Sequence, residues 1–149
     1  MKVDSCVNVP RCAIETVLPF TDLFLLDLKA FASNLHRKLT GAPNERILEN
    51  IRFIAEAGKT IEIRIPLVPG HNDSAENLAE TAKFLASLPV VPPVRLLPYH
   101  ALARSKYEAV GRPDTMPHVP SPGRIELQKA AALMKANGAE TVIIHGEKY

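Results

Sequence analysis

Three aliphatic segments of the chain each run into a cluster of polar residues near their C-terminal end. These segments lie at residues 23–29, 61–73 and 94–100. Each has the aliphatic content of a buried strand, and stretches with helical character separate them. Strand–helix–strand order repeated in this way predicts an α/β fold with a parallel sheet.

The stretches between the strands carry helix signals. Residues 43–58 have an apolar stripe at helical spacing, and Asn44 is placed to cap the start of this helix. Residues 73–88 predict a second helix, capped by Asp73 or Ser74. A third helix is expected over residues 121–138, with Ser121 as its cap. Further expected elements are a short helix at residues 10–18, an irregular surface segment at 105–120 and a final strand at 140–144.

The two faces of the predicted strands differ in character. Because side chains alternate between faces, Asp27 and Lys29 share one face of the first strand, and Arg64 lies opposite the aliphatic side chains of the second. A parallel sheet covered by helices on both faces should be almost continuously apolar. We therefore expect helices on one face only, with the charged face lining the lumen of a barrel that holds a ligand.

Four residues near the strand ends are candidates for one shared site: Asp27, Lys29, Arg64 and His100. Ligands bind α/β folds where the C-terminal ends of the strands meet the following loops. Lys29 can engage a carboxylate or a phosphate, and Asp27 can hold a cation or an amine. His100 can donate a hydrogen bond, bind a metal or exchange a proton.

Each candidate also has a plain structural interpretation. Asp27 and Lys29 can form a surface salt bridge at a strand end, and His100 can be a structural histidine. A buried guanidinium at Arg64 needs anionic or carbonyl partners, and the pattern offers Glu62, which shares its strand face. The pattern alone leaves both interpretations open.

Composition narrows the class of protein. The chain has 149 residues, enough for one domain with a real core, and 46% of them are hydrophobic and 23% charged, as in globular domains. The net charge is only +2, which argues against a nucleic-acid partner. The basic residues are spread out, apart from a modest cluster at Arg95, Arg104, Lys106 and Arg112.

No membrane association is expected from the sequence. The apolar runs are far shorter than the roughly 18–20 residues that span a bilayer. The N-terminus lacks the apolar core of a signal peptide, which favours a cytoplasmic location.

Cysteine and histidine usage points away from disulfide and zinc chemistry. Cys6 and Cys12 form no disulfide framework and match no common metal motif, so we expect free thiols in a reducing compartment. A metal-dependent barrel hydrolase would need clustered histidine and aspartate ligands, whereas the five histidines are scattered. That class is disfavoured.

Several short motifs, taken together, resemble those of a known family. They are Val3-Asp4-Ser5-Cys6, Asp27-Leu28-Lys29, Leu39-Thr40-Gly41, the segments 63–73 and 96–100, and Lys106-Tyr107. Over nearly its whole length the chain resembles the glycyl-radical-enzyme activating enzymes. These are radical S-adenosylmethionine proteins typified by pyruvate formate-lyase activating enzyme.

The resemblance implies a fold and a set of ligand contacts. The fold would be a partial (β/α) barrel with parallel strands and helices on the outer face. Asp27, Leu28, Lys29 and His100 would contact S-adenosylmethionine, and Arg64 would line the same cavity. Asp4 and Asp27 would hold a monovalent cation.

The resemblance also implies a reaction and partners. In this family an iron–sulfur cluster reduces S-adenosylmethionine, and the resulting 5′-deoxyadenosyl radical removes a hydrogen from a glycine of a partner enzyme such as pyruvate formate-lyase. The implied partners are that glycyl radical enzyme and a flavodoxin-type electron donor, in anaerobic metabolism.

One departure from the family pattern is large. The three cysteines spaced Cys-x3-Cys-x2-Cys are absent, and Cys6 and Cys12 cannot replace them, because a cluster needs several thiolates arranged around it. Residues 1–149 therefore resemble the C-terminal portion of such an enzyme, without the cluster-binding N-terminal half and inactive alone. The alternative is a non-catalytic binding or interaction module of the same barrel type.

Overall fold

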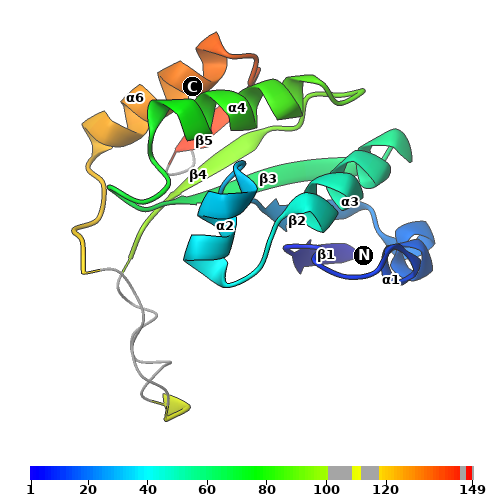
Figure 1. Ribbon diagram of the computed structural model, residues 1–149. Helices are drawn as coiled ribbons and strands as arrows, with labels where there is room; N and C mark the ends of the chain where they lie inside the picture. The colour runs from blue at the N-terminus through cyan, green and yellow to red at the C-terminus, as the bar shows by residue number, and fades with distance from the viewer. Residues whose placement is uncertain (101–108, 112–117, 145–146, 149) are drawn as a thin grey trace.

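The computed structural model describes residues 1–100, 109–111, 118–144 and 147–148. Strands and helices alternate along the chain, as the sequence predicts (Figure 1). The strands are β1 (Lys2–Ser5), β2 (Leu23–Asp27), β3 (Thr60–Leu67), β4 (Val94–Pro98), β5 (Val142–Ile144) and β6 (Glu147–Lys148). The helices are α1 (Arg11–Val17), the 3₁₀ helix η1 (Leu18–Phe20), α2 (Ser33–Thr40), α3 (Glu45–Glu56), α4 (Ala75–Ala86) and α6 (Arg124–Ala136).

The strands of the described residues form one sheet in the order β1-β2-β3-β4-β5-β6. Every pairing from β1 to β5 is parallel, and only β6 runs antiparallel to its neighbour. The predicted parallel α/β fold is therefore confirmed. Strand order follows chain order, which is how strands are arranged in a (β/α) barrel.

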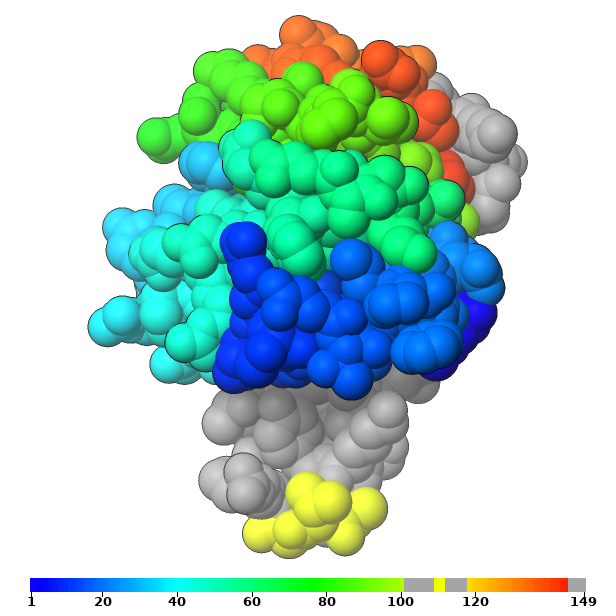
Figure 2. All heavy atoms as spheres, turned by 90° about the vertical axis from the view of Figure 1, so that its right-hand side faces the viewer, coloured from blue at the N-terminus to red at the C-terminus, as the bar shows by residue number. Residues whose placement is uncertain are grey.

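The core lies between the sheet and helices on one of its faces. Phe24, Leu26, Ile63 and Leu96 point into it and are fully buried. Helices α3, α4 and α6 lie along this side of the curved sheet (Figure 1), and Figure 2 shows their surfaces stacked in chain order. The opposite face carries the half-buried charged side chains of β2, β3 and β4.

One predicted helix cap is confirmed in position only, and another is wrong. Asn44 is the N-cap residue of α3, but its side chain makes no capping hydrogen bond and instead donates to the carbonyls of Ala30 and Phe31. Ser121 lies ahead of α6, whose N-cap is Gly123, and its hydroxyl donates to the carbonyl of Tyr99. The predicted cap of α4 at Ser74 is confirmed, since its hydroxyl accepts from the Asn77 amide.

Two other elements differ from expectation. Helix α2 is not among the predicted helices: it is short and polar, and Leu35 and Leu39, one turn apart, are its only aliphatic side chains. Most of the segment expected to be irregular at 105–120 lies outside the described residues. No helix in the described part of the chain combines the length and apolar character that crossing a membrane requires.

A buried asparagine joins the C-terminal ends of β2 and β3. The side-chain amide of Asn72, which is 2% exposed, donates to the carbonyls of Lys29 and Pro66 at 2.7 and 2.8 Å. Its side-chain oxygen accepts from the Val68 amide at 2.8 Å. Asn72 thus satisfies backbone groups that the strands cannot pair themselves, and it fixes the loop beside Lys29.

We predict that Asn72→Ala lowers the free energy of unfolding by about 2–3 kcal/mol, because it leaves buried backbone groups without partners. The exposed Asn8 provides a matched control, since Asn8→Ala removes the same amide from the surface. Urea unfolding of the three proteins, followed by circular dichroism, measures the difference. Equal midpoints for the two variants would contradict this role of Asn72.

Candidate functional site

The parallel register places charged side chains in two rows on the face of the sheet that the helices of the described residues leave uncovered. Asp27, Arg64 and Arg95 are direct neighbours across β2, β3 and β4. The second row lies two residues closer to the N-terminal ends of the strands. There Asp4 pairs with Leu25, and Leu25 pairs with Glu62. Residues paired in register point to the same face, so these side chains share one surface.

Arg64 spans this surface and binds carboxylates on two other strands. Its Nε–H donates to Asp27 Oδ1 at 2.9 Å, and its Nη1 donates to Asp4 Oδ2 at 2.8 Å. Its Nη2 binds Asp4 Oδ1 and also lies 2.9 Å from Asp27 Oδ1. The guanidinium therefore crosses over β2 and forms a two-pronged contact with Asp4 on β1.

Burial and charge act in opposite directions on Arg64. Burial of its side chain, which is 20% exposed, favours the neutral form and works to lower its pKa. The hydrogen bonds from Asp4 and the negative charge of Asp27 outweigh this, and the net effect raises the pKa of Arg64. Arg64 is thus a permanent cation held between two carboxylates.

Lys29 extends the cluster past the end of β2. Its ammonium donates to Asp27 Oδ2 at 2.8 Å, so the two oxygens of Asp27 serve different cations. The predicted contact between Asp27 and Lys29 is confirmed, but it belongs to a wider network rather than to an isolated surface pair. We call Asp4, Asp27, Lys29 and Arg64 the charged cluster.

The predicted pairing of Arg64 with Glu62 is wrong. Glu62 instead binds Arg95, whose Nε and Nη2 lie 2.6 and 3.0 Å from its two carboxylate oxygens. The hydrogen bond to Glu62 is the main reason that the pKa of Arg95 is raised. Arg95 therefore belongs to the sheet, whereas Arg104, Lys106 and Arg112, which the sequence groups with it, lie outside the described residues.

The other two expected ligand residues, Leu28 and His100, make no hydrogen bond to the side chains of the charged cluster in the part of the chain that the structure describes. The Leu28 side chain is buried in the core, and its N–H donates to the Arg64 carbonyl at 3.0 Å. His100 follows β4 at the same end of the sheet and is exposed, with Nδ1 3.5 Å from the Ser121 hydroxyl. Within the described residues, no hydrogen bond links His100 to the cluster.

An iron–sulfur cluster does not fit the residues present. Cys6 and Cys12 are both exposed free thiols. In the described part of the chain, no group of three or more histidine, cysteine, aspartate or glutamate residues is placed to hold a metal ion. Two thiolates do not complete the ligand set of such a cluster.

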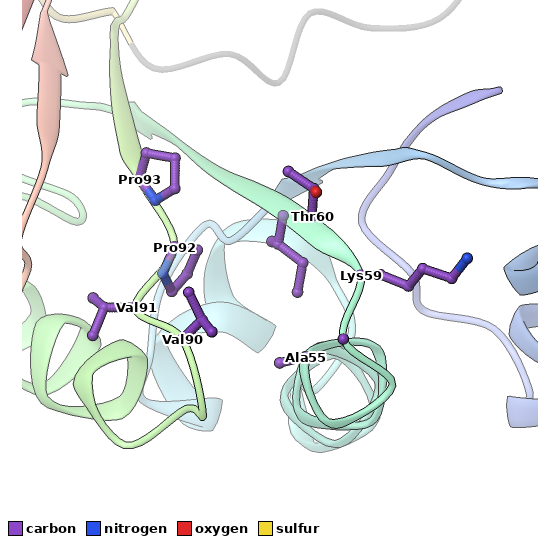
Figure 3. A pocket seen from close by; sticks show the side chains of 9 residues that line it. Ala55, Lys59, Thr60, Val90, Val91, Pro92 and Pro93 are labelled. Carbon is purple, nitrogen blue, oxygen red and sulfur yellow. The ribbon is translucent and has the colours of Figure 1, made fainter.

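A cavity of about 280 Å³ lies at the opposite end of the sheet, where β3 and β4 begin (Figure 3). Ala55, Ile61, Val90, Val91 and Pro92 supply much of its lining. The Lys59 side chain points away from it, and its ammonium donates to the Thr21 carbonyl. The cavity lacks converging polar groups and lies at the end of the strands that α/β ligand sites do not use.

Sequence reasoning missed the role of two site residues. The sequence groups Arg95 with Arg104, Lys106 and Arg112, because it does not show which strands are neighbours, although alternation along residues 94–97 indicates the face that Arg95 occupies. No role for Asn72 is predicted from the sequence. A buried asparagine between two strand ends leaves no signal in a single sequence beyond its turn composition.

Comparisons with known proteins agree on one family, although no family model matches the chain. The indoleacetate decarboxylase activating enzyme of Tractidigestivibacter scatoligenes is 32% identical over 95% of this chain and 45% of its own length. The isethionate sulfite-lyase activating enzyme of Desulfovibrio desulfuricans is 38% identical over 86% of this chain and 39% of its own length. The chain thus spans less than half the length of these relatives.

One solved structure is closer to this chain in length. The crystal structure of a domain of pyruvate-formate lyase-activating enzyme from Bacteroides vulgatus superposes with a TM-score of 0.79 at 32% sequence identity. The match covers 97% of this chain and 80% of that one. Sequence and fold agree over nearly the whole chain, which therefore belongs to the family of glycyl-radical-enzyme activating enzymes.

Proposed function

We propose that the chain is the C-terminal portion of a radical S-adenosylmethionine enzyme that generates a glycyl radical on a partner such as pyruvate formate-lyase. The observation that carries this proposal is the charged cluster. It gathers side chains from three strands at the C-terminal ends of a parallel sheet, on the face that helices leave uncovered. Family membership supports the same reading.

The residues present suit the amino-acid end of S-adenosylmethionine. Lys29 and Arg64 offer cationic donors for a carboxylate, and Asp27 offers an acceptor for an amine. His100 and the backbone at Leu28 border the same space at the strand ends. When bound, S-adenosylmethionine supplies the 5′-deoxyadenosyl group that acts as the hydrogen acceptor.

Asp4 and Asp27 form a site for positive charge, which the guanidinium of Arg64 fills in this structure. We propose that the same two carboxylates hold a monovalent cation in the assembled enzyme. Arg64 would then give up its contact with at least one of these carboxylates and face the ligand, because the monovalent cation and the guanidinium would compete for the same oxygens.

The reducing cluster belongs, in this proposal, to residues outside the chain. Cys6 and Cys12 cannot hold it, and the curated relatives are more than twice as long as the segment they share with this chain. Among the described strands, β1 lies at the edge of the sheet. An edge strand can accept a further strand from an N-terminal half that completes the barrel.

Further parts of the proposal follow from the family. The complete protein would work in the cytoplasm with a flavodoxin-type donor that supplies the electron through the iron–sulfur cluster. The isolated chain would be inactive. No role in binding nucleic acid or a membrane is proposed.

A second candidate is a non-catalytic interaction module that recognises a glycyl radical enzyme. The observation that favours it is the pairing of every charge in the cluster with another, together with the lack of cluster-binding cysteines. Such a module would bind the partner enzyme but not S-adenosylmethionine, even with the missing half supplied.

A chimaera tests the main proposal. Residues 1–149 replace the corresponding segment of the Staphylococcus epidermidis pyruvate formate-lyase-activating enzyme, which is 36% identical over 118 residues. We expect the reconstituted, reduced chimaera to release 5′-deoxyadenosine from S-adenosylmethionine and to produce a glycyl radical signal in the electron paramagnetic resonance spectrum of pyruvate formate-lyase. A chimaera that holds its cluster but releases no 5′-deoxyadenosine would refute the catalytic proposal and leave the interaction module.

Lys29→Ala in this chimaera should weaken S-adenosylmethionine binding by about tenfold, the equivalent of about 1.4 kcal/mol, because a charge-assisted hydrogen bond to the ligand is lost. Lys83→Ala is the matched control, since Lys83 is an exposed lysine paired with Glu80 on α4. Isothermal titration calorimetry measures both. Equal affinities for the two variants would remove Lys29 from the site.

Iron binding tests the assignment of the cluster to other residues. After anaerobic treatment with iron and sulfide, the isolated chain should show no stable four-iron cluster by absorption spectroscopy and iron analysis. The variant with Cys6→Ser and Cys12→Ser should give the same residual iron content. A cluster that forms on the natural chain and is lost in the variant would contradict this assignment.

A further inference from the structure

Glu62 lies on the same strand as Arg64, but Arg64 forms its ion pairs with Asp4 and Asp27 instead. The two residues share the uncovered face of β3 and lie two positions apart, about 6.6 Å along the strand. An arginine side chain can reach across that distance. Arg64 instead extends across β2 to Asp4, which lies two strands away.

Arg95 explains this choice of partner. Its Nε and Nη2 form a bidentate pair with the two oxygens of Glu62, at 2.6 and 3.0 Å. The Glu62 side chain is largely buried, with 16% of it exposed. Both oxygens of Glu62 are therefore engaged by one guanidinium, whose positive charge offsets the carboxylate and makes Glu62 a weaker partner for a second arginine.

The two arginines also repel each other. Arg64 and Arg95 are direct partners in the register of β3 and β4, so their side chains start side by side on one face. The positive charge of Arg64 works to lower the pKa of Arg95, although the hydrogen bond to Glu62 outweighs this effect. With Arg95 held at Glu62, the favourable direction for Arg64 is away from β4, toward the carboxylates of β1 and β2.

We propose that Arg95 is a positioning residue: by occupying Glu62, it directs the guanidinium of Arg64 to Asp27 and Asp4. The significance of this for ligand binding rests on the function proposed above, but the geometric effect does not. Arg95 needs no contact with the ligand in this role. It acts by removing the competing carboxylate.

The expected consequence is specific. In Arg95→Met, Glu62 loses its ion-pair partner. We expect the guanidinium of Arg64 then to bind Glu62 in place of Asp27 and Asp4. The double variant Arg95→Met with Glu62→Gln removes the competing charge as well, so Arg64 should return to Asp27. Arg95→Lys leaves one oxygen of Glu62 free and should shift only part of the Arg64 population.

Nuclear magnetic resonance of the chain distinguishes these states without a ligand. In the natural protein, the Arg64 Nε proton should show a nuclear Overhauser contact to the Asp27 Hβ protons. In Arg95→Met this contact should be replaced by one to the Glu62 Hγ protons, and the double variant should restore it. An unchanged contact to Asp27 in Arg95→Met, or no restoration in the double variant, would overturn the proposal.

If Arg95→Met fails to fold, the same nuclear Overhauser measurement on Arg95→Lys tests the proposal. Both contacts should then appear together at reduced intensity, and a pure Asp27 contact would count against the proposal. In the chimaera, Arg95→Met should weaken S-adenosylmethionine binding about tenfold, and the double variant should recover to within about twofold. If the resonance contacts move as expected while affinity stays constant, Arg95 positions Arg64 but the proposed ligand role of Arg64 fails.

Discussion

The parallel register of β1 to β4 is the constraint on which both the core and the site depend. It places Phe24, Leu26 and Ile63 against the helices and, by the same alternation, Asp27 and Arg64 on the uncovered face. A slip of one residue would exchange the two sets. Arg64 would then lie in the core without a carboxylate, at a large cost in free energy. Selection for a packed core therefore also fixes the geometry of the site.

Much of this arrangement could be predicted from the sequence, because its signals are local. Alternation with a period of two places Asp27, Lys29 and Arg64 on one face of their strands, and in the structure Asp27 bonds to both Lys29 and Arg64. The apolar stripe of residues 43–58 predicted α3 to within a few residues of its ends. Helix α2, by contrast, is only eight residues long with two leucines, and its clearest signal is the C-cap Gly41, whose φ is 82°.

The choice of partners could not be predicted, because it depends on which strands are neighbours. Glu62 is the nearest carboxylate to Arg64 in sequence, yet Arg64 binds Asp4, sixty residues away. Arg95 takes Glu62 because β4 lies beside β3 on the side away from β2. The asparagines behave in the same way. Asn44 and Asn72 bind backbone carbonyls that come within reach only after the sheet has formed.

The charge balance of the cluster limits what can bind there. Asp4 and Asp27 carry two negative charges, and Lys29 and Arg64 carry two positive charges, all paired with one another. In the proposed function, a group with a single charge that enters alone would displace one partner and leave another charge of the cluster without its ion pair, which costs free energy. An amino-carboxylate group brings one charge of each sign, so its ammonium can replace a cation at Asp27 while its carboxylate receives the cation released. Under the proposed function, this balance would favour a zwitterionic group over a simple anion, as expected for the amino-acid end of S-adenosylmethionine.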